Sequence, residues 1–322
     1  MKKLFLLLCT VVIGLSCEHN KIFYTTSDGQ ELTLSSDSDQ WGAYLLSNKY
    51  EEGQGVLTFL GKVSKIGDKA FQNCNTLTSV TLPEEVSSIG DSTFYNCNSL
   101  ANITLPNSVS SIGASAFSSC SALTSITIPN GVTAIGDKTF YDCTNLANVS
   151  IPSGVTSIGE SAFYHCTALT NIALPDSLAT IGDRAFYACS ALTSVAIPDN
   201  IKTIGEGAFQ DCTSLIEATI GIGITSIGNY AFDNCYNLTN VSIGYNIASI
   251  GNYAFWNCYK LECVTCGASE PPTYGRFALW KDSSRGREII KCDINVDMNC
   301  QEDYGVTPGW SDHTNYIISY DW

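Results

Sequence analysis

The residues that first suggest chemistry are cysteines, because 15 of the 322 residues are cysteine and only three are histidine. Nine of these cysteines recur at one fixed spacing, from Cys74 and Cys97 to Cys258. Many cysteines in an oxidising compartment normally indicate disulfides. Nine thiols at one repeated position, on rungs about 4.8 Å apart, would however have to pair arbitrarily along a uniform column. We therefore expect buried free thiols, because cysteine packs well as a small hydrophobic residue.

A second group of cysteines lies near the end of the chain. Cys263 and Cys266 form a C-x-x-C pair, and Cys292 and Cys300 follow. Zinc would need both thiols of the pair on one side, but the repeat register places Cys266 on the inward face of a strand and Cys263 on the outward face. The sequence therefore predicts no metal site. Whether Cys292 and Cys300 form a disulfide stays open, because spacing does not determine pairing.

The histidines offer little acid-base chemistry. His165 directly precedes Cys166, which is the pairing that a base-activated thiol nucleophile would use. The position of His165 is occupied by other residue types in the other copies, such as Asn73, so it is a variable position beside a core thiol. His19 and His313 lie in the flanks without evident partners. We therefore predict no catalytic residue, no cofactor and no enzymatic activity.

These cysteines belong to a unit that is repeated nine times in one unbroken register, without insertion. It reads I-G-x-x-x-F-x-x-C-x-x-L-x-x-V-x-L-P-x-x-V. One unit has too little apolar surface to fold alone, but stacked copies bury their apolar residues against one another. The sequence therefore predicts a solenoid. The Ile-Gly pairs begin at Ile66, Ile89, Ile112, Ile135, Ile158, Ile181, Ile204, Ile227 and Ile250.

Two periodicities within the unit predict its secondary structure. Alternation of apolar and polar residues over 80–82 favours a short strand with its apolar residues inward. The spacing of three between apolar residues over 71–77 favours a 3₁₀ or irregular helical turn. Each early strand ends at a proline such as Pro83, which Gly221 and Gly244 replace in later units. The expected fold is an α/β-type repeat solenoid, with short parallel strands on one face, short helical or 3₁₀ turns on the other, and small terminal caps.

The repeat unit resembles the 23-residue leucine-rich repeats of BspA-type bacterial surface proteins, whose copies read I-G-x-x-A-F-x-x-C-x-x-L-x-x-V-x-I-P. The resemblance covers residues 57–266. Residues 22–55 resemble the leading cap of that family, and residues 309–322 resemble its closing segment. The resemblance implies a surface-exposed or outer-membrane repeat protein that binds other macromolecules, in some members host matrix proteins, and it implies no enzyme.

The N-terminus predicts export. Lys2 and Lys3 precede an apolar run over residues 4–15, which is too short for a membrane span of about 20 residues and is typical of a signal peptide. We therefore expect a signal peptide at residues 1–16.

Gly14, Leu15, Ser16 and Cys17 resemble the lipobox of bacterial lipoproteins, although Gly14 and Leu15 depart from its usual leucine and small residue. The resemblance implies lipidation at Cys17 and a lipid-anchored protein of the bacterial cell envelope. Ordinary secretion is the alternative. The remaining parts are then residues 17–56 as lipid attachment, tether and leading cap, residues 57–266 as the solenoid, and residues 267–322 as the closing cap.

The charge balance excludes some partners. Sixteen basic and 31 acidic side chains give a net charge of −15, which repels nucleic acid and anionic lipid head groups. We therefore expect no nucleic-acid partner, and contact with the membrane only through the lipid.

The outward strand positions form the most informative surface, because nearly all of them are small, polar and uncharged. Such a stripe suits a protein or carbohydrate ligand, although the same residues would also simply solvate a parallel sheet. A second candidate is an aromatic register shared by Tyr230 and Tyr253, which suits a binding hot spot or plain ring stacking. The outward positions are Ser125, Thr127, Asn148, Ser150, Asn171, Ser194, Glu217, Thr219 and Asn240.

Three functional classes compete. A cell-surface binding or adhesion protein agrees best with the predicted export, the open repeat surface and the absence of an acid-base cluster. A self-associating structural component of the cell envelope is the alternative, and an enzyme comes last. The last third of the chain, from Glu217 onward, departs from the uniform repeat, which a specific ligand would require and a lattice would not. The sequence leaves the ligand and the oligomeric state open.

Overall fold

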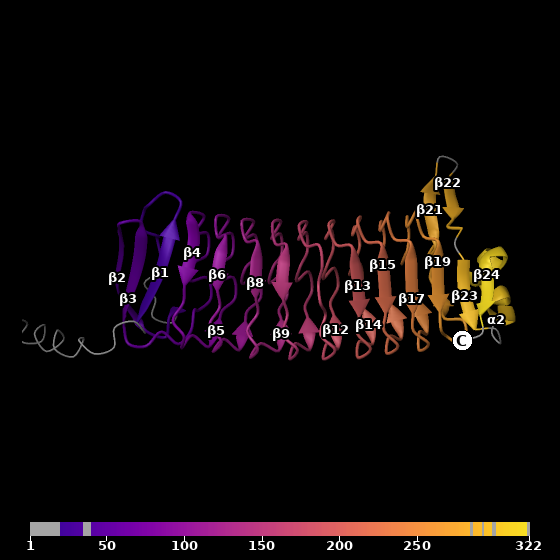
Figure 1. Ribbon diagram of the computed structural model, residues 1–322, viewed down its shortest axis with the longest axis horizontal. Helices are drawn as coiled ribbons and strands as arrows, with labels where there is room; N and C mark the ends of the chain where they lie inside the picture. Colours follow the sequence, from indigo (N-terminus) through magenta and orange to yellow (C-terminus); the bar gives the residue numbers. More distant parts are fainter. Residues whose placement is uncertain (1–19, 35–39, 284–285, 292, 298–300, 321–322) are drawn as a thin grey trace, which may run out of the picture.

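The chain forms an elongated solenoid of about ten stacked coils between two terminal caps (Figure 1). The predicted repeat solenoid is therefore confirmed. Residues 1–16, Cys17, His19, Cys292 and Cys300 lie outside the described residues, so the predictions made for them stay predictions. The computed structural model describes residues 20–34, 40–283, 286–291, 293–297 and 301–320.

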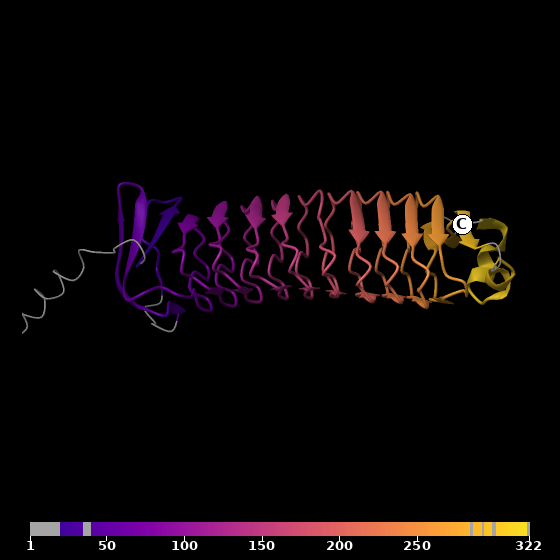
Figure 2. The same cartoon turned by 60° about the horizontal axis from the view of Figure 1, so that its bottom comes forward.

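Most coils contribute one strand to a parallel arrangement that we call the strand face (Figure 2). Alternate residues of a strand such as β13 are exposed and buried, which follows the alternation in the sequence. Equivalent residues of successive units face each other, so that Ser194 pairs with Glu217. The strands are β4 (Leu77–Thr81), β6 (Asn102–Thr104), β8 (Ser125–Thr127), β10 (Asn148–Ser150), β13 (Ser194–Ile197), β15 (Glu217–Ile220), β17 (Asn240–Ile243), β19 (Cys263–Cys266), β23 (Asp293–Asp297) and β24 (Ile317–Tyr320).

A second row of parallel strands, which the sequence analysis did not predict, forms at the Ile-Gly positions. The glycines permit close contact between coils, because a Cβ atom on Gly90 would lie 2.5 Å from the backbone nitrogen of Asp68 in the preceding coil. Its strands are only two residues long. They are β5 (Ser88–Ile89), β7 (Ser111–Ile112), β9 (Ala134–Ile135), β11 (Ser157–Ile158), β12 (Thr180–Ile181), β14 (Thr203–Ile204), β16 (Ser226–Ile227), β18 (Ser249–Ile250) and β20 (Thr273–Tyr274).

The third side, which we call the turn face, consists of tight turns, where the sequence predicted short helical or 3₁₀ turns. Alternate amides over residues 70–74 bond to the carbonyl three residues earlier. The intervening amides of Lys69, Phe71 and Asn73 donate instead to the next coil, at 2.8 to 2.9 Å. A 3₁₀ helix needs consecutive bonds of the first kind. Lys69 and Asn73 also have positive φ angles of 61° and 62°, as the third residue of a type II turn requires.

Nine phenylalanine rings, from Phe71 to Phe255, stack along the axis of the solenoid. Neighbouring ring centres lie 5.1 to 5.6 Å apart, and their planes differ by at most 17°. Trp41 of the leading cap closes the column, because its ring meets Phe71 edge-on at 5.3 Å. The stacked rings are buried, as the repeat pattern predicts.

The nine repeat cysteines form a parallel column of buried free thiols beside the rings. Each thiol from Cys97 onward donates to the phenylalanine carbonyl of the preceding coil, and the bond from Cys166 to Phe140 is 3.2 Å long. Burial raises the pKa of these thiols, to about 12 for Cys143 and Cys189. They therefore remain protonated donors, which makes them poor nucleophiles.

The strand face is a continuous sheet only in its last part. β6 and β8 are neighbours that do not pair, and residues 171–174 form no strand, whereas β13 to β24 form one unbroken sheet. In that part Gly221, Gly244 and Gly267 each donate a backbone hydrogen bond of 2.9 to 3.2 Å to the preceding coil. Earlier coils have proline at this position, which lacks the donor. The missing bond weakens the pairing between the earlier strands.

A cap closes each end of the stack of coils. The leading cap is an antiparallel sheet that continues to residue 60, and β1 pairs with β4 to close the first coil. At the other end, Tyr274 pairs with Ile250 of the ninth unit, so a tenth coil continues the stack beyond residue 266. The cap elements are β1 (Lys21–Thr26), β2 (Tyr44–Glu51), β3 (Gln54–Leu60), the hairpin of β21 (Trp280–Ser283) and β22 (Gly286–Ile289), the helix α2 (Gln301–Val306) and the 3₁₀ helix η3 (Trp310–Tyr316).

Removal of one ring from the phenylalanine column should destabilise the solenoid strongly. Phe163 is fully buried and stacks on Phe140 at 5.3 Å and on Phe186 at 5.2 Å. We expect Phe163→Ala to lower the free energy of unfolding by about 3 to 5 kcal/mol, measured by urea denaturation. Ser153→Ala on an exposed loop is the control and should unfold near the wild-type midpoint. An unchanged midpoint for the phenylalanine variant would contradict the stacking.

Candidate functional site

The predicted binding residues of the strand face are all exposed, on the outward side of their strands. Six coils supply them, from β8 to β17, and Asn171 belongs to the coil that forms no strand. Glu217 is the one charged residue among them. Backbone pairing between β8 and β10, and among β13, β15 and β17, spaces most of these side chains at the interval of the coils. The list in full is Ser125, Thr127, Asn148, Ser150, Asn171, Ser194, Glu217, Thr219 and Asn240.

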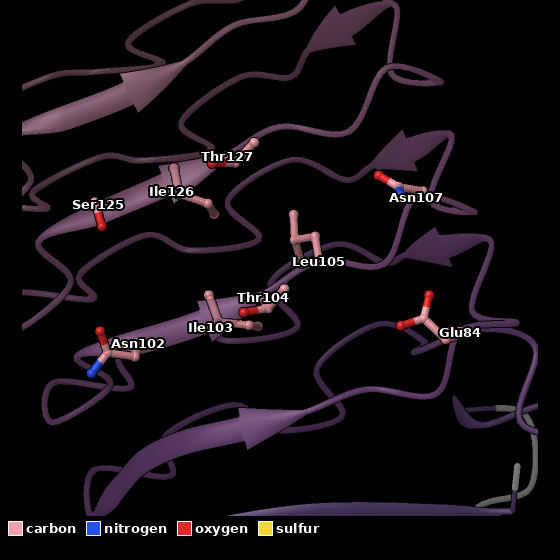
Figure 3. A pocket seen from close by; sticks show the side chains of 9 residues that line it. All are labelled: Glu84, Asn102, Ile103, Thr104, Leu105, Asn107, Ser125, Ile126 and Thr127. Carbon is pink, nitrogen blue, oxygen red and sulfur yellow. The ribbon is translucent and has the colours of Figure 1, made fainter.

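A groove of about 500 Å³ opens on this face where β6 and β8 fail to pair. In Figure 3 the polar side chains of both strands stand beside the groove, and Leu105 lies between the two coils. The sequence analysis placed Ser125 and Thr127 on this face but did not predict the groove, because the groove depends on strand pairing. The lining residues are Glu84, Asn102, Ile103, Thr104, Leu105, Asn107, Ser125, Ile126 and Thr127.

The aromatic candidates lie on a different side of the solenoid from the strand face. Tyr230 and Tyr253 belong to the turn face, where their rings stack at 5.1 Å with planes 2° apart. Tyr230 is 36% exposed, and Tyr253 is half-buried. The structure therefore does not bring the tyrosines and the strand-face residues together, and the two predicted surfaces are separate sites.

A second tyrosine column on the turn face was missed by the sequence analysis. The rings of Tyr141, Tyr164 and Tyr187 stack at 4.6 Å, and Lys138 and Arg184 border them in a shallow depression of about 480 Å³. The hydrogen bond to Asp211 is the main reason why the pKa of Tyr187 is raised to about 12, and burial of the phenol adds to the effect. The phenol of Tyr187 therefore acts as a neutral hydrogen-bonding group. Their recurrence two residues before successive repeat cysteines was the signal that could have revealed them.

Asp233 occupies the same register further along and is a buried carboxyl group. Asp233 is only 6% exposed, and Gln210 Nε2 donates a hydrogen bond of 2.8 Å to the Oδ2 atom of Asp233. Its Oδ1 has no hydrogen-bond partner within the described part of the chain. Burial, and then the negative charge of Asp211, raises the pKa of Asp233 to about 7.

The residues considered for catalysis and metal binding do not converge. His165 is exposed, and its Nδ1 lies 2.6 Å from Asp142 Oδ1, whereas the thiol of Cys166 donates into the core. Cys266 is buried and Cys263 is half-buried on the outward side of β19, so the two thiols face opposite ways, as the register predicts. In the ranges that the structure describes, no cluster of three histidine, cysteine, aspartate or glutamate side chains could hold a metal ion.

The repeat region matches a family profile described as a BspA type leucine rich repeat region, in six copies over residues 55–167 and 133–262. No curated protein sequence matches the chain. Among the described residues, no helix is long and apolar enough to cross a membrane.

Several solved bacterial structures are similar to the chain. A leucine rich repeat protein of Treponema pallidum has 24% identity and a TM-score of 0.48, over 70% of this chain and 90% of that one. A leucine-rich repeat protein of Bacteroides ovatus has 20% identity and a TM-score of 0.45, over 85% and 90%. The pneumococcal vaccine antigen PcpA has 18% identity and a TM-score of 0.42, over 81% and 78%. Similarity at these levels concerns the fold alone.

Asp233 should make the folded protein less stable at neutral pH than at weakly acidic pH. Its pKa of about 7 in the folded chain exceeds its ordinary value of 3.8, so between these values the folded chain holds a proton that the unfolded chain has lost. Asp233 therefore contributes up to about 4 kcal/mol to the free energy of unfolding below about pH 4. This contribution is lost as the pH rises through about 7. We expect Asp233→Asn to melt above the wild type near pH 8, by about 5 °C or more.

The comparison needs a second variant, because other groups titrate in the same range. Burial lowers the pKa of His313 to about 4, which costs stability as the pH falls. The difference in melting temperature between Asp233→Asn and the wild type isolates the aspartate, and the exposed Asp176→Asn is the control. Melting curves of Asp233→Asn that run parallel to the wild type from about pH 4 to about pH 8 would contradict the assignment.

Proposed function

The chain belongs to the BspA-type leucine-rich repeat family, and from that premise we propose that it is a cell-surface binding or adhesion protein. Repeat solenoids of this kind serve as scaffolds for interaction, because stacked coils create an extended surface that single domains lack. In this proposal a macromolecular partner, a protein or a glycan, binds across the strand face. The aromatic column of Tyr230 and Tyr253 is the alternative site.

One observation carries the proposal: the strand face is a long, exposed and almost uncharged row of hydrogen-bonding side chains. A face that merely needed solubility could carry lysine and glutamate, which are the usual residues of solvated surfaces. Small serine, threonine and asparagine side chains lose little conformational entropy on binding, and the strands already fix their spacing. The groove between β6 and β8 adds a hollow in which a protruding group of the partner fits.

The location belongs to the same proposal. The family and the predicted signal peptide support export to the bacterial surface, and Cys17 is the proposed site of lipid attachment. β1 of the leading cap begins at Lys21, four residues after Cys17 in the sequence. A lipid at Cys17 would therefore hold the leading cap close to the membrane surface.

Self-association is the second candidate, and the leading cap favours it. β2 is the outer strand of the first sheet, so one of its edges pairs with no strand of the described chain. Tyr44, Leu46 and Leu60 near its start are 66%, 57% and 58% exposed. An open strand edge beside exposed apolar side chains is a typical site for pairing with another chain.

Two lysines in the middle of the strand face should block the partner. We expect Asn148→Lys/Asn171→Lys to weaken binding at least about tenfold, because two long charged side chains would obstruct the face. The partner comes from a screen of the soluble chain, from residue 18 onward, against matrix proteins, glycans and the chain itself. Surface plasmon resonance measures the affinity. Ala134→Lys/Thr180→Lys, at exposed positions of the second row of strands, is the matched control.

The opposite pattern of binding by the variants would assign the binding site to the turn face. If the strand-face variant binds like the wild type while Tyr230→Ala/Tyr253→Ala loses binding, then the strand face is solvated scaffold and the aromatic column is the site. Binding of the chain to itself that disappears when Leu46→Lys is introduced into β2 would instead support the self-associating component.

Changing Cys17 to serine should release the protein from the membrane. Without the thiol the lipid cannot be attached. A signal peptide that has been cleaved off does not hold the mature protein in the membrane. We expect Cys17→Ser in the soluble fraction on immunoblots of fractionated cells, with Cys9→Ser as the control that remains with the membranes. Both variants in the membrane fraction would place the anchor elsewhere.

A further inference from the structure

We propose that the turn face binds an acidic polysaccharide at its C-terminal end, through the aromatic column of Tyr230, Tyr253 and Phe277 and the guanidinium groups of Arg276 and Arg287. We call these five residues the aromatic–arginine cluster. The cluster lies on a different side of the solenoid from the strand face, so this inference does not require the strand face to bind a partner.

The aromatic residues stand at a position where the fold itself favours other residues. Tyr230, Tyr253 and Phe277 have φ angles of 56°, 55° and 56°. Bulky side chains rarely adopt this left-handed conformation, which costs stability. Only the last three coils have aromatic residues at this position, so the coils can stack on one another without them. The same position in earlier coils holds Lys69, Ser92, Ser115, Lys138, Ser161, Arg184 and Gly207.

The three rings form a continuous apolar strip with polar ends. Tyr230 stacks on Tyr253 at 5.1 Å, and Tyr253 contacts Phe277 at 5.6 Å. Trp256 supports the strip from below, because it is buried and meets the rings of both Tyr253 and Phe277 edge-on. Apolar ring edges beside phenolic hydroxyls suit a sugar chain, which also alternates C–H surfaces with hydroxyl groups.

Two arginines converge on the strip. The Cζ atom of Arg276 lies 4.9 Å from the centre of the Phe277 ring, and that of Arg287 lies 4.7 Å from the same ring and 5.5 Å from Trp256. The two guanidinium groups therefore contact one and the same ring. These distances are typical of cation–π contacts. Stacking on a ring fixes a guanidinium while its N–H groups remain directed to the side, where they can bind an oxyanion in a bidentate manner.

Neither arginine forms an ion pair with another described residue. In the part of the chain that the structure describes, no carboxylate oxygen lies within 4.0 Å of either guanidinium. Arg287 faces Asp282 across the β21–β22 hairpin, yet its side chain contacts the rings instead. By contrast Arg184, further along the same face, pairs with Glu206 at 3.6 Å.

Unpaired arginines are unexpected in a chain with a net charge of −15. Their charge complements a ligand that carries carboxylate or sulfate groups, whereas the acidic body of the protein repels such a ligand elsewhere. The hairpin of β21 and β22 projects from this end of the solenoid and carries Arg287 (Figure 1). A polyanion would therefore bind at the end of the solenoid rather than along it.

The test uses the soluble chain from residue 18 onward and three polysaccharides. Heparin carries sulfate, polygalacturonate carries only carboxylate, and dextran is neutral. We expect saturable binding of heparin, polygalacturonate or both in isothermal titration calorimetry, weakening as salt is raised, and no binding of dextran. The preferred polyanion identifies whether sulfate or carboxylate is recognised.

Two variants examine the cluster itself. Arg276→Gln/Arg287→Gln should weaken binding about tenfold or more, because both charged donors are lost. Tyr230→Ser/Tyr253→Ser should weaken it as well without unfolding the chain, because serine occupies the same position in three earlier coils. Lys138→Gln/Arg184→Gln, on the same face but several coils away, is the matched control and should bind like the wild type. A thermal melt of each variant verifies folding.

Three results would overturn the proposal. These are the absence of binding to both polyanions at low salt, equal binding by the arginine variant and the wild type, and tighter binding of polyglutamate than of either polysaccharide, which would indicate an acidic protein partner. The strand-face variant Asn148→Lys/Asn171→Lys separates this site from the proposed function. It should retain polyanion binding even if it loses the other partner.

Discussion

The hydrogen bonds between successive coils are the constraint on which the rest of the structure depends. They fix the rise per coil near the spacing of parallel strands, about 4.8 Å. At that rise each residue lies against the equivalent residue of the next coil. A residue type is therefore suitable for a buried position only if its side chain packs against an identical side chain. Phenylalanine does so face to face at 5.1 to 5.6 Å, and cysteine does so by donating to a carbonyl of the neighbouring coil. The glycine of each Ile-Gly pair is needed because two backbones meet there without room for a Cβ atom.

This constraint also determines where specificity can arise. Columns that are identical in every coil hold the solenoid together, and they cannot distinguish one ligand from another. Recognition must therefore come from columns that change along the axis. The replacement of proline by glycine after the sixth coil changes the strand face from interrupted to continuous pairing. On the turn face one column changes from small or charged residues to Tyr230, Tyr253 and Phe277. Both changes fall in the same third of the molecule.

Sequence periodicity predicted the solenoid, the buried column from Phe71 to Phe255 and the exposed strand positions, because these depend only on register. It predicted turns over residues 71–77 but not their hydrogen-bond pattern, since a spacing of three suits both a 3₁₀ turn and turns that alternate their bonds between coils. Two-residue strands such as β5 have no detectable periodicity. The tenth coil was hidden by one inserted residue and by Tyr274 in place of isoleucine. The groove beside Ser125 was also beyond the sequence, because all early coils share the proline although only some neighbouring strands, such as β6 and β8, fail to pair.

The length of the stack sets the distance between the proposed lipid anchor and the proposed binding sites. Ten coils at about 4.8 Å extend for about 45 Å, and backbone hydrogen bonds and the phenylalanine column join successive coils. β1 of the leading cap begins at Lys21, four residues after Cys17, whereas the aromatic–arginine cluster lies on the last coils and the adjoining hairpin. A lipid at Cys17 would thus place the changing columns at the end farthest from the membrane. In that arrangement the last coils would be the first part of the protein to meet a partner, and the earlier coils would hold them away from the membrane.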